Sequence, residues 1–574
     1  MGSIKKTKEE AAISRRGFLA AAASLGALSA AAGVAGCAPQ PMASTEGTGA
    51  SSGDGSASAS GNPAWLGDEP TIGEDEIVQT LDTEVLVVGG GTSGLFAAAS
   101  AAENGAKTMV AEKFTGGGVR IGFGALGSRL QKEANVEVDK DAVVRELLRY
   151  SNHNADVRLL KTWADHSGEA VDWWQDRCAE QGVPMWFEPG GQVEGENYWY
   201  MQTCHSPQFP VDEEGNPTEL DGAFVLTEYC KGLGVDFQYN TAMVKLVKEG
   251  DRVVGVIAKN SDGDYVRINA SKGVIVCTGG YGQNSEMLAA LQPDTMKKIG
   301  YSSAIPGTEG DGIKACIWAG AAFDDTHTSS MFDRACVMPD EVGGWEKGAP
   351  GWFWMGSQPL LKVDLTGLRF MSESVPYDCI LQQALNLPDN TWCTLWDANI
   401  EEDVRRFSTQ GCSRYFEFEN GAPPQIPWVG VQAINEGLEA DGFIQRADTI
   451  AELAEKLGLP ADQLEQTVAR YNELFDAQND EDFGKEAYRL SALRTPPFFG
   501  VRQTGYLLCT LDGIKVNTEM QAVDEAGQPI AGLYVAGVDS GGYYSGTYPS
   551  HAGGNCCGRN STFGRLAGRY AATA

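Results

Sequence analysis

Residues 84–112 read EVLVVGGGTSGLFAAASAAENGAKTMVAE, and this stretch decides how the rest of the chain is interpreted. It predicts a buried strand, a glycine turn, an alanine-rich helix and a second strand that ends in an acid. Gly89, Gly91 and Gly94 have the GxGxxG spacing. Glu112 follows Gly94 by 18 residues, near the roughly 20 expected of an acid that binds a ribose hydroxyl. The stretch therefore predicts a dinucleotide site, and hence a redox enzyme.

Each glycine of this turn has a physical role. Gly89 allows a tight turn after the strand, and Gly91 removes a side chain where the backbone approaches a pyrophosphate. Gly94 lets the helix and the strand pack closely. The N-terminus of the helix then offers free N–H groups and the positive end of its dipole to the phosphates. The strand before the glycines, the helix after them and the acid at the expected distance together favour a dinucleotide site over a merely structural turn.

The first 80 residues are predicted to lie outside the fold. An apolar, Ala/Gly-rich run follows the twin arginines Arg15 and Arg16 and ends before Cys37. A transmembrane helix is the alternative interpretation of that run. The twin arginines indicate instead that residues 1–37 are an export signal. The triplet Ala-Gly-Cys resembles a bacterial lipoprotein cleavage site with Cys37 as the lipid-bearing residue. We therefore expect export by the twin-arginine route, a lipid anchor in the cytoplasmic membrane, and a flexible linker over residues 38–80.

Length, charge and cysteine spacing limit the class of protein. A chain of 574 residues with 42% hydrophobic residues predicts two or more domains with sizeable cores. The net charge of −33 argues against nucleic acid as a partner and indicates an acidic, soluble surface. The 13 cysteines show no zinc, haem or iron–sulfur spacing, so no metal site is predicted.

Two later segments choose between a nicotinamide and a flavin cofactor. Residues 273–280 and 532–539 each have the pattern of a short buried strand that ends in a glycine turn. Two strands that return to one cofactor, one of them late in the sequence, suit a long extended ligand such as FAD. The large insertion between them has the length to cap the site.

These and further motifs resemble the soluble fumarate reductase family of FAD proteins, whose relatives include flavocytochrome c, urocanate reductase and 3-ketosteroid dehydrogenase. The motifs are EK at 112–113, GG at 116–117, GTEGDG at 307–312, GLRFMSE at 367–373, DFG at 482–484, GGN at 553–555 and FGRLAG at 563–568. The resemblance implies an α/β fold with a split Rossmann-like FAD-binding domain, residues 81–324 and 504–574. An inserted α+β capping domain, residues 325–503, is expected to close over the flavin.

The resemblance also implies the cofactor contacts. Glu112 is expected to bind the adenosine ribose, Asp539 the ribityl chain, and the backbone of Met243 the adenine. A helix that begins at Cys556 and Cys557 is expected to face the pyrimidine edge of the flavin, where its dipole stabilises negative charge on the reduced ring. The full set of expected cofactor-binding residues is Gly89, Gly91, Ser93, Gly94, Glu112, Lys113, Gly116, Gly117, Gly118, Met243, Gly280, Asp311, Asp539, Cys556 and Cys557.

The family's dicarboxylate clamp is the part that this chain lacks. Fumarate reductases hold their substrate with His and Arg side chains, and one Arg also donates the proton. Here Tyr377 replaces that Arg, His551 replaces the Arg before the last GGN, and LLCTLDG at 507–513 replaces an HHTMGG segment. A dianion in a cavity without these cations would be poorly paired and costly to desolvate. Fumarate is therefore not the expected substrate.

The replacements resemble another branch of the family. ESVPY at 373–377 and TYP at 547–549 are similar to the NESxPY and SYPG segments of ketosteroid dehydrogenases. This similarity implies that Tyr377 exchanges a proton with a substrate carbon and that Tyr548 hydrogen-bonds a carbonyl, a role that His551 can share. A phenol suits both tasks because its ordinary pKa of about 10 makes it a donor at neutral pH.

The resulting prediction is an exported FAD-dependent reductase of an activated C=C bond in an enone, enoate, lactone or aryl acrylate. Hydride comes from flavin N5, the proton comes from Tyr377, and the electrons come from an external partner, a cytochrome or a membrane quinol-linked donor. Two alternatives stay open: a 3-ketosteroid-type dehydrogenase that runs the reverse reaction, and a lipoprotein that binds a ligand without catalysis.

Overall fold

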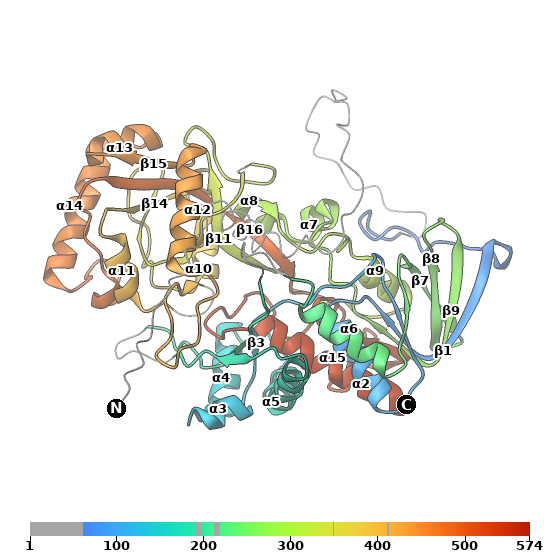
Figure 1. Cartoon of the computed structure of the whole chain (residues 1–574). Coiled ribbons are helices and arrows are strands. Elements are labelled where there is room, and N and C mark those ends of the chain that lie inside the picture. The colour runs from blue at the N-terminus through green and yellow to red at the C-terminus, as the bar shows by residue number, and fades with distance from the viewer. Residues whose placement is uncertain (1–60, 191–196, 212–217, 348, 410–412) are drawn as a thin grey trace, which may run out of the picture.

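The centre of the fold is a mixed sheet to which both early and late segments of the chain contribute (Figure 1). The computed structural model describes residues 61–190, 197–211, 218–347, 349–409 and 413–574; the predicted export signal lies outside these ranges. The sheet runs in the order β17-β18-β9-β1-β2-β6, and β7 and β8 extend it from β9. Its strands are β1 (Ile77–Val88), β2 (Thr108–Ala111), β6 (Asp236–Gln238), β7 (Ala242–Glu249), β8 (Arg252–Lys259), β9 (Tyr265–Val276), β17 (Gln521–Val523) and β18 (Pro529–Val535).

Strand β1 explains why this sheet forms. It pairs in parallel with β2 and β9, and its last four residues, 85–88, are all buried. A continuous apolar run such as VLVV is what a parallel strand buried on both faces requires. The strand already begins at Ile77, which pairs with Tyr265 on β9. Residues 77–80, predicted to be part of a flexible linker, are therefore strand.

Two helices from opposite ends of the chain pack on this sheet. Helix α2 (Thr92–Glu103) follows β1, and helix α15 (Asn555–Thr573) follows β18. The hydroxyl of Ser100 donates to the carbonyl of Arg565 (2.7 Å) across 465 positions of sequence. The domain predicted to be split is thus completed by its last helix.

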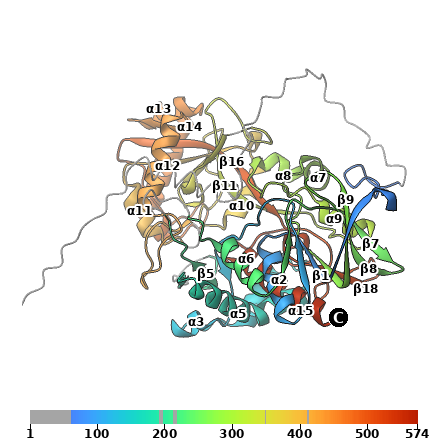
Figure 2. The ribbon, with the colours of Figure 1, turned by 45° about the vertical axis from the view of Figure 1, so that its right-hand side comes forward.

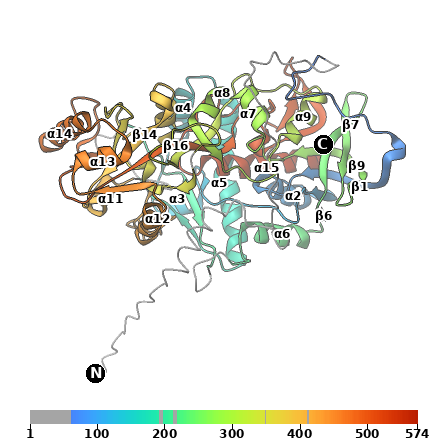
Figure 3. The same ribbon diagram turned by 90° about the horizontal axis from the view of Figure 1, so that it is seen from above.

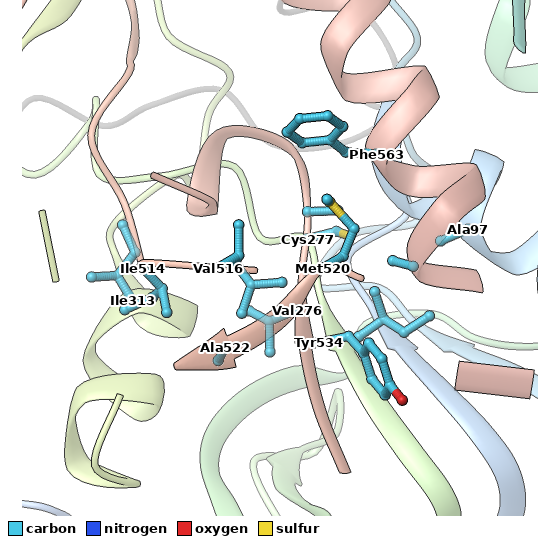
Figure 4. Close-up of a cluster of buried hydrophobic side chains, with 14 of the residues drawn as sticks. Ala97, Val276, Cys277, Ile313, Ile514, Val516, Met520, Ala522, Tyr534 and Phe563 are labelled. Atoms are coloured by element: carbon cyan, nitrogen blue, oxygen red, sulfur yellow. The ribbon is translucent and has the colours of Figure 1, made fainter. Parts of the chain in front are cut away.

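Glycines let α2 and α15 approach each other. A Cβ at Gly564 would lie 2.4 Å from a backbone oxygen of α2, and one at Gly568 would lie 2.2 Å from another. The FGRLAG motif is therefore a helix-packing motif. Figure 4 shows the apolar layer beside it, where Ala97 and Phe563 lie near Cys277 and Tyr534.

A second sheet forms the capping region, at the left of Figure 1. Strand β16 (Phe498–Thr510) is its spine, because β10, β11, β14 and β15 all pair with it. The other strands are β10 (Ile299–Ser302), β11 (Ser329–Val337), β12 (Ala349–Trp352), β13 (Leu361–Asp364), β14 (Trp392–Trp396) and β15 (Ile444–Ala447). Seen from above in Figure 3, β16 extends from this sheet toward the first sheet and its helix α15. The sheet thus crosses both predicted boundaries, since β10 precedes residue 325 and β16 continues beyond 503.

The helices are divided between the two regions (Figure 2). Those of the cap are α10 (Tyr377–Ala384), α11 (Ile400–Phe407), α12 (Trp428–Ala440), α13 (Ile450–Leu457) and α14 (Ala461–Ala477). Those preceding the cap are α3 (Arg129–Glu133), α4 (Lys140–Tyr150), α5 (Val157–Glu180), α6 (Gly222–Gly232), α7 (Ser285–Leu291), α8 (Pro293–Lys298) and α9 (Asp311–Trp318). Among the described residues, no helix is long and apolar enough to cross a membrane.

A small third sheet lies next to α15, and its strand order is β3-β5-β4. Its strands are β3 (Phe123–Gly124), β4 (Met185–Phe187) and β5 (Cys204–Pro207). Buried His205 holds it: Nε2 is 2.7 Å from the Ser128 hydroxyl, and Nδ1 is 2.8 Å from the Thr203 carbonyl. Burial lowers the His205 pKa to about 4. This histidine therefore has a structural role.

Candidate active site

The glycine turn after β1 leaves a helix end open. Gly89 has φ +99°, and a Cβ on Gly94 would lie only 1.8 Å from the Gly89 carbonyl oxygen. Gly91 is the N-cap of α2, and no side chain among the described residues caps this end. Nothing lies closer than 3.8 Å to a Cβ built on Gly91. The turn is tightly packed at Gly94, where helix and strand meet, and open at Gly91, where a phosphate would approach the helix. Ser93 lies buried in the first turn of α2.

Glu112 closes the same site from the end of β2. Its Oε2 accepts the N–H of Gly90 (2.5 Å), and its Oε1 accepts the N–H of Phe114 (2.9 Å). The side chain is almost buried, and burial raises its pKa against the opposing effect of these two amides. Glu112 therefore fixes the glycine turn to β2. Its contact with a ribose stays a prediction.

In the loop after Glu112, one of three consecutive glycines is tightly packed and the other two face open space. A Cβ on Gly117 would lie 1.6 Å from the Gly90 carbonyl oxygen, whereas those on Gly116 and Gly118 would meet no heavy atom within 4 Å. Only the middle glycine is required by the protein's own packing. The open positions on either side fit the predicted passage of the pyrophosphate and flavin.

Lys113 and Asp311 bind each other. The Lys113 ammonium lies 3.0 Å from Asp311 and 2.7 Å from Glu309, and these carboxylates raise its pKa although burial opposes them. Asp311 is the first residue of α9, whose N-cap Gly310 has φ +85°, and the Gly312 N–H in the first turn donates to the Thr278 hydroxyl (3.2 Å). The pair joins the end of β2 to the GTEGDG turn.

Asp539 joins two strand ends. Its carboxylate is fully buried and accepts hydrogen bonds from the N–H groups of Thr278, Gly279 and Gly280 and from the Thr278 hydroxyl. Gly280 has φ +79°, and its Cβ would lie 2.2 Å from the Thr510 hydroxyl. The predicted contact of Asp539 with the ribityl chain stays a prediction. Its visible role is to hold the turn after β9 against β18.

Met243 lies in β7, away from the glycine turn in sequence but on the same sheet. Its side chain is buried, and it is opposite Ala258 of β8. A backbone contact from here to an adenine stays a prediction.

The N-terminus of α15 is the second open helix end. Gly554 caps it with φ +72° and without a side-chain cap in the described structure. Cys556 and Cys557 form its first turn, and a hydrogen bond from the Cys509 thiol lowers the Cys556 pKa to about 6. Arg559, buried one turn further on, has no partner among the described residues for its Nε and Nη1.

These features fit FAD. The glycine-capped ends of α2 and α15 offer backbone N–H groups to phosphate and to a flavin edge, and the open positions at Gly116 and Gly118 leave room for the chain between them. The free N–H donors of Arg559 suit an electron-rich ligand. Arg559 is a cofactor-side residue that the sequence analysis missed.

Tyr377 lies at one end of a column of aromatic rings. It is the first residue of α10, and its ring stacks on Phe332 with centroids 4.6 Å apart. Phe332 stacks on Tyr506 (5.5 Å), and Tyr506 stacks on Trp352 (5.1 Å) and Tyr301 (5.4 Å). We call these five residues the aromatic column. Phe332 and Tyr506 are buried within this column, which ends at the predicted proton donor.

Tyr548 and His551 lie on the segment before α15. Burial raises the pKa of Tyr548 well above its ordinary value, so its phenol keeps its proton. His551 is buried, and its Nε2 lies 3.3 Å from Oε1 of Glu146. Burial opposes the charge of Glu146, but His551 and Arg149 outweigh it and lower the Glu146 pKa to about 2. One nitrogen of His551 thus already faces an ionised carboxylate.

The structure links the two predicted catalytic segments through neighbours that the sequence did not single out. Asp378, next to Tyr377, accepts hydrogen bonds from Tyr150 (2.7 Å) and from Ser550 (3.4 Å). No motif marks Tyr150 or Glu146, because both belong to α4, a helix more than 220 residues earlier than Asp378. Only a contact across the fold reveals them.

Comparison with known proteins agrees with this architecture. The model of the FAD binding domain family matches residues 84–556. The chain is 30% identical over 498 residues to the vinyl phenol reductase of Lactiplantibacillus plantarum, covering 85% of this chain and 96% of that one. It is 26% identical over 501 residues to the probable fumarate reductase Ifc3 of Shewanella frigidimarina, covering 85% and 75%.

A solved structure shares the fold. The 3-ketosteroid Δ1-dehydrogenase from Sterolibacterium denitrificans superposes with a TM-score of 0.66 at 18% identity, over 86% of this chain and 99% of that one. At this identity the likeness shows a shared fold. The chain therefore belongs to the FAD binding domain family and is an FAD-dependent oxidoreductase.

Proposed function

We propose that this protein reduces a C=C bond that is conjugated to an aromatic ring or a carbonyl group. Bound FAD supplies the hydride. The observation that carries the proposal is the aromatic column, in which the Tyr377 ring stacks on Phe332 and further stacked rings follow it. Flat rings bind a flat, apolar substrate by stacking and burial. The likeness over most of both chains to a protein named vinyl phenol reductase supports the same substrate class.

We assign to the chain's own residues the roles that the sequence resemblance implies. Tyr377 at the start of α10 donates its phenolic proton to the substrate carbon next to the one that receives hydride. Tyr548, whose pKa burial keeps high, donates a hydrogen bond to a substrate carbonyl or phenol oxygen. His551 orders this segment through its contact with Glu146, which is a more limited role than the carbonyl donor expected from the sequence.

Charge argues for a neutral or singly charged substrate. A dianion held against the rings of the aromatic column would lose hydration without matching ion pairs. Arg334 is buried beside the column, with its guanidinium 5.0 Å from the Phe332 ring centre. Its Nε and Nη2 already donate to the hydroxyls of Ser357 (2.9 Å) and Ser413 (2.7 Å). Fumarate, with two carboxylates, is the poorer fit.

A second candidate is the reverse reaction, a ketosteroid-type dehydrogenation. Tyr377 and Tyr548 serve either direction, and the ESVPY segment favours this candidate. The reduction potential of the bound flavin separates the two, because a dehydrogenase flavin must be reduced by its substrate. A third candidate, a ligand-binding lipoprotein without catalysis, predicts no flavin colour change with any substrate.

The deciding experiment is anaerobic flavin reoxidation. The holoprotein is reduced chemically and mixed with 4-vinylphenol, cinnamate, a steroid enone or fumarate. We expect an aryl alkene or aryl acrylate to reoxidise the flavin faster than fumarate does. Failure of the whole panel, or fumarate as the fastest acceptor, would refute the proposal.

The proton role of Tyr377 has its own test. Tyr377→Phe keeps the stacked ring and removes the hydroxyl, so turnover should fall by about 10²-fold or more. Tyr265→Phe is the matched control, because it removes a phenol from the first residue of β9, in the first sheet. Equal turnover in the two variants would exclude Tyr377 as the proton donor.

We also propose that the protein is exported, is anchored by lipid at Cys37 and receives electrons from a separate cytochrome or quinol-linked donor. Support comes from the twin arginines and from the absence of a haem motif in the sequence. Full turnover with NADH alone would contradict the external donor.

A further inference from the structure

The carboxyl group of Asp378 joins segments that lie far apart in the sequence. Asp378 is the second residue of α10 in the cap, and it is 4% exposed. Its Oδ1 accepts the hydroxyl of Tyr150 (2.7 Å) and that of Ser550 (3.4 Å). Its Oδ2 is buried and has no hydrogen-bond partner in the described ranges of the chain. One oxygen thus makes the connection, and the other has none.

Tyr150 continues the connection into the FAD side. It ends α4, and its carbonyl accepts the Thr547 hydroxyl (3.2 Å). Its ring packs against His551 with centroids 4.5 Å apart. Glu146, on the same helix, is 3.3 Å from the His551 Nε2. Helix α4 therefore holds both ends of the segment that carries Tyr548.

We propose that Asp378 is a positioning residue that joins the cap to the FAD side, so that Tyr377 and Tyr548 are brought together only when Tyr150, Asp378 and Ser550 are in contact. We call these three residues the junction. The inference rests on the proposed function for the meaning of Tyr377 and Tyr548. The junction itself is defined by its hydrogen bonds.

The surroundings of Asp378 favour the neutral acid. The titratable groups that face it are Tyr150 of α4, Tyr198, Cys379 of α10, Asp333 of β11, Lys298 of α8 and, beyond Tyr150, the His551–Glu146 pair. Burial is the largest effect, Asp333 adds to it, and together they outweigh the hydrogen bonds from Tyr150 and Ser550. The Asp378 pKa is raised to about 7. A neutral acid also suits an Oδ2 without a partner.

The direction of the pH effect follows from this. When the junction is open and Asp378 meets water, its carboxyl returns to an ordinary pKa near 3.8. The closed junction therefore binds the proton more tightly, and closure weakens as the pH rises from about 4 to about 7, by up to roughly tenfold per pH unit. Above pH 7 no further loss from this group is expected. An asparagine, which carries the same acceptor oxygen and does not titrate, removes the effect.

Hydrogen exchange on the FAD-loaded protein tests the junction without any substrate. Amide protection of residues 140–150 and 377–384 is measured at pH 5 and pH 8 and corrected for the intrinsic exchange rate. We expect wild-type protection to fall at least tenfold between the two conditions. Asp378→Asn should stay protected at both. Tyr150→Phe should be unprotected at both, since it loses the hydroxyl that reaches Asp378.

Asp403→Asn is the matched control. Asp403 is also a buried cap carboxyl with a raised pKa, and it lies on α11 against Arg406 rather than in the junction. This variant should keep the wild-type loss of protection. Equal protection of the wild type at both pH values, or a loss in Asp378→Asn as large as in the wild type, would overturn the proposal.

Kinetics with the alkene that reoxidises the wild type adds a readout that a purely structural role would not change. Asp378→Asn should match the wild-type kcat at pH 5 and exceed it at pH 8, whereas Tyr150→Phe should lower kcat more than it raises KM. A kcat of Asp378→Asn that falls with pH as in the wild type would contradict the inference. If no alkene reoxidises the wild type, the proposed function fails, and the exchange result still decides the junction.

Discussion

Gly117 lies at the tightest point of the cofactor cradle, and its replacement by alanine measures how that cradle is built. The new Cβ would lie 1.6 Å from the carbonyl oxygen of Gly90 and 2.5 Å from its carbonyl carbon. Both are backbone atoms, so no side chain can rotate away. The two loops would have to separate by roughly 1.5 Å, and overpacking of this kind costs about 1–3 kcal/mol. The clash is internal to the protein, so the free energy of unfolding should fall even without cofactor.

Gly116 provides a matched control one residue earlier. A Cβ there meets no heavy atom within 4 Å. Gly116→Ala should therefore change the stability of the flavin-free protein by no more than about 0.5 kcal/mol. It places a methyl group where we expect the cofactor to pass, so it should weaken FAD binding instead. The two neighbouring substitutions separate protein packing from cofactor space.

The assay uses flavin-free wild type and both variants. Thermal unfolding should show a drop of several degrees for Gly117→Ala alone, since 1 kcal/mol corresponds to about 2–4 °C in a domain of roughly 150–250 residues. A fluorescence titration with FAD should show weaker binding for both variants. Equal melting temperatures in all three proteins would refute the close contact with Gly90. Wild-type FAD affinity in Gly116→Ala would refute the predicted path of the cofactor.

Two further predictions concern charge and export. The Glu146 pKa of about 2 lies below its ordinary 4.5, so the carboxylate stabilises the fold fully above pH 4.5 and loses this effect as the pH falls through about 2. Glu146→Gln should therefore lower the melting temperature at pH 7 and make it decline less steeply as the pH is lowered. If the melting temperature declines in acid as it does in the wild type, the result counts against the His551 contact. Replacing Arg15 and Arg16 by lysine should keep the protein in the cytoplasm, and Cys37→Ser should release the exported form from the membrane; fractionation that shows neither change would contradict the proposed anchor.

The FAD-binding part of the fold was largely predictable from local sequence. The GxGxxG spacing needs only short-range geometry, because Gly89 and Gly94 contact each other within one turn of chain. The predicted strands at 273–280 and 532–539 are confirmed as β9 and β18, since short buried runs have a local signature. The identity of the cofactor followed from combining these segments.

The remainder depends on contacts between distant segments. Strand β16 pairs with four other strands, and nothing in its own sequence specifies which. The carboxylate of Asp539 accepts hydrogen bonds from backbone N–H groups at the end of another strand, and no sequence motif reveals these contacts. The contact of His551 with Glu146 likewise joins the segment before α15 to helix α4 without any fixed spacing. Such residues need the assembled fold to be recognised.

The packing of α15 against α2 means that this part of the fold can form only late in synthesis of the chain. Ser100 leaves the ribosome 465 residues before its partner Arg565. At roughly 5–20 residues per second, synthesis of that interval takes on the order of half a minute to a minute and a half. During this time the N-terminus of α15, where we expect the flavin to bind, has not been made, so we expect FAD loading to follow synthesis of this helix. A transport route that accepts only finished, loaded enzyme would suit such a protein, because premature export would carry an empty chain across the membrane.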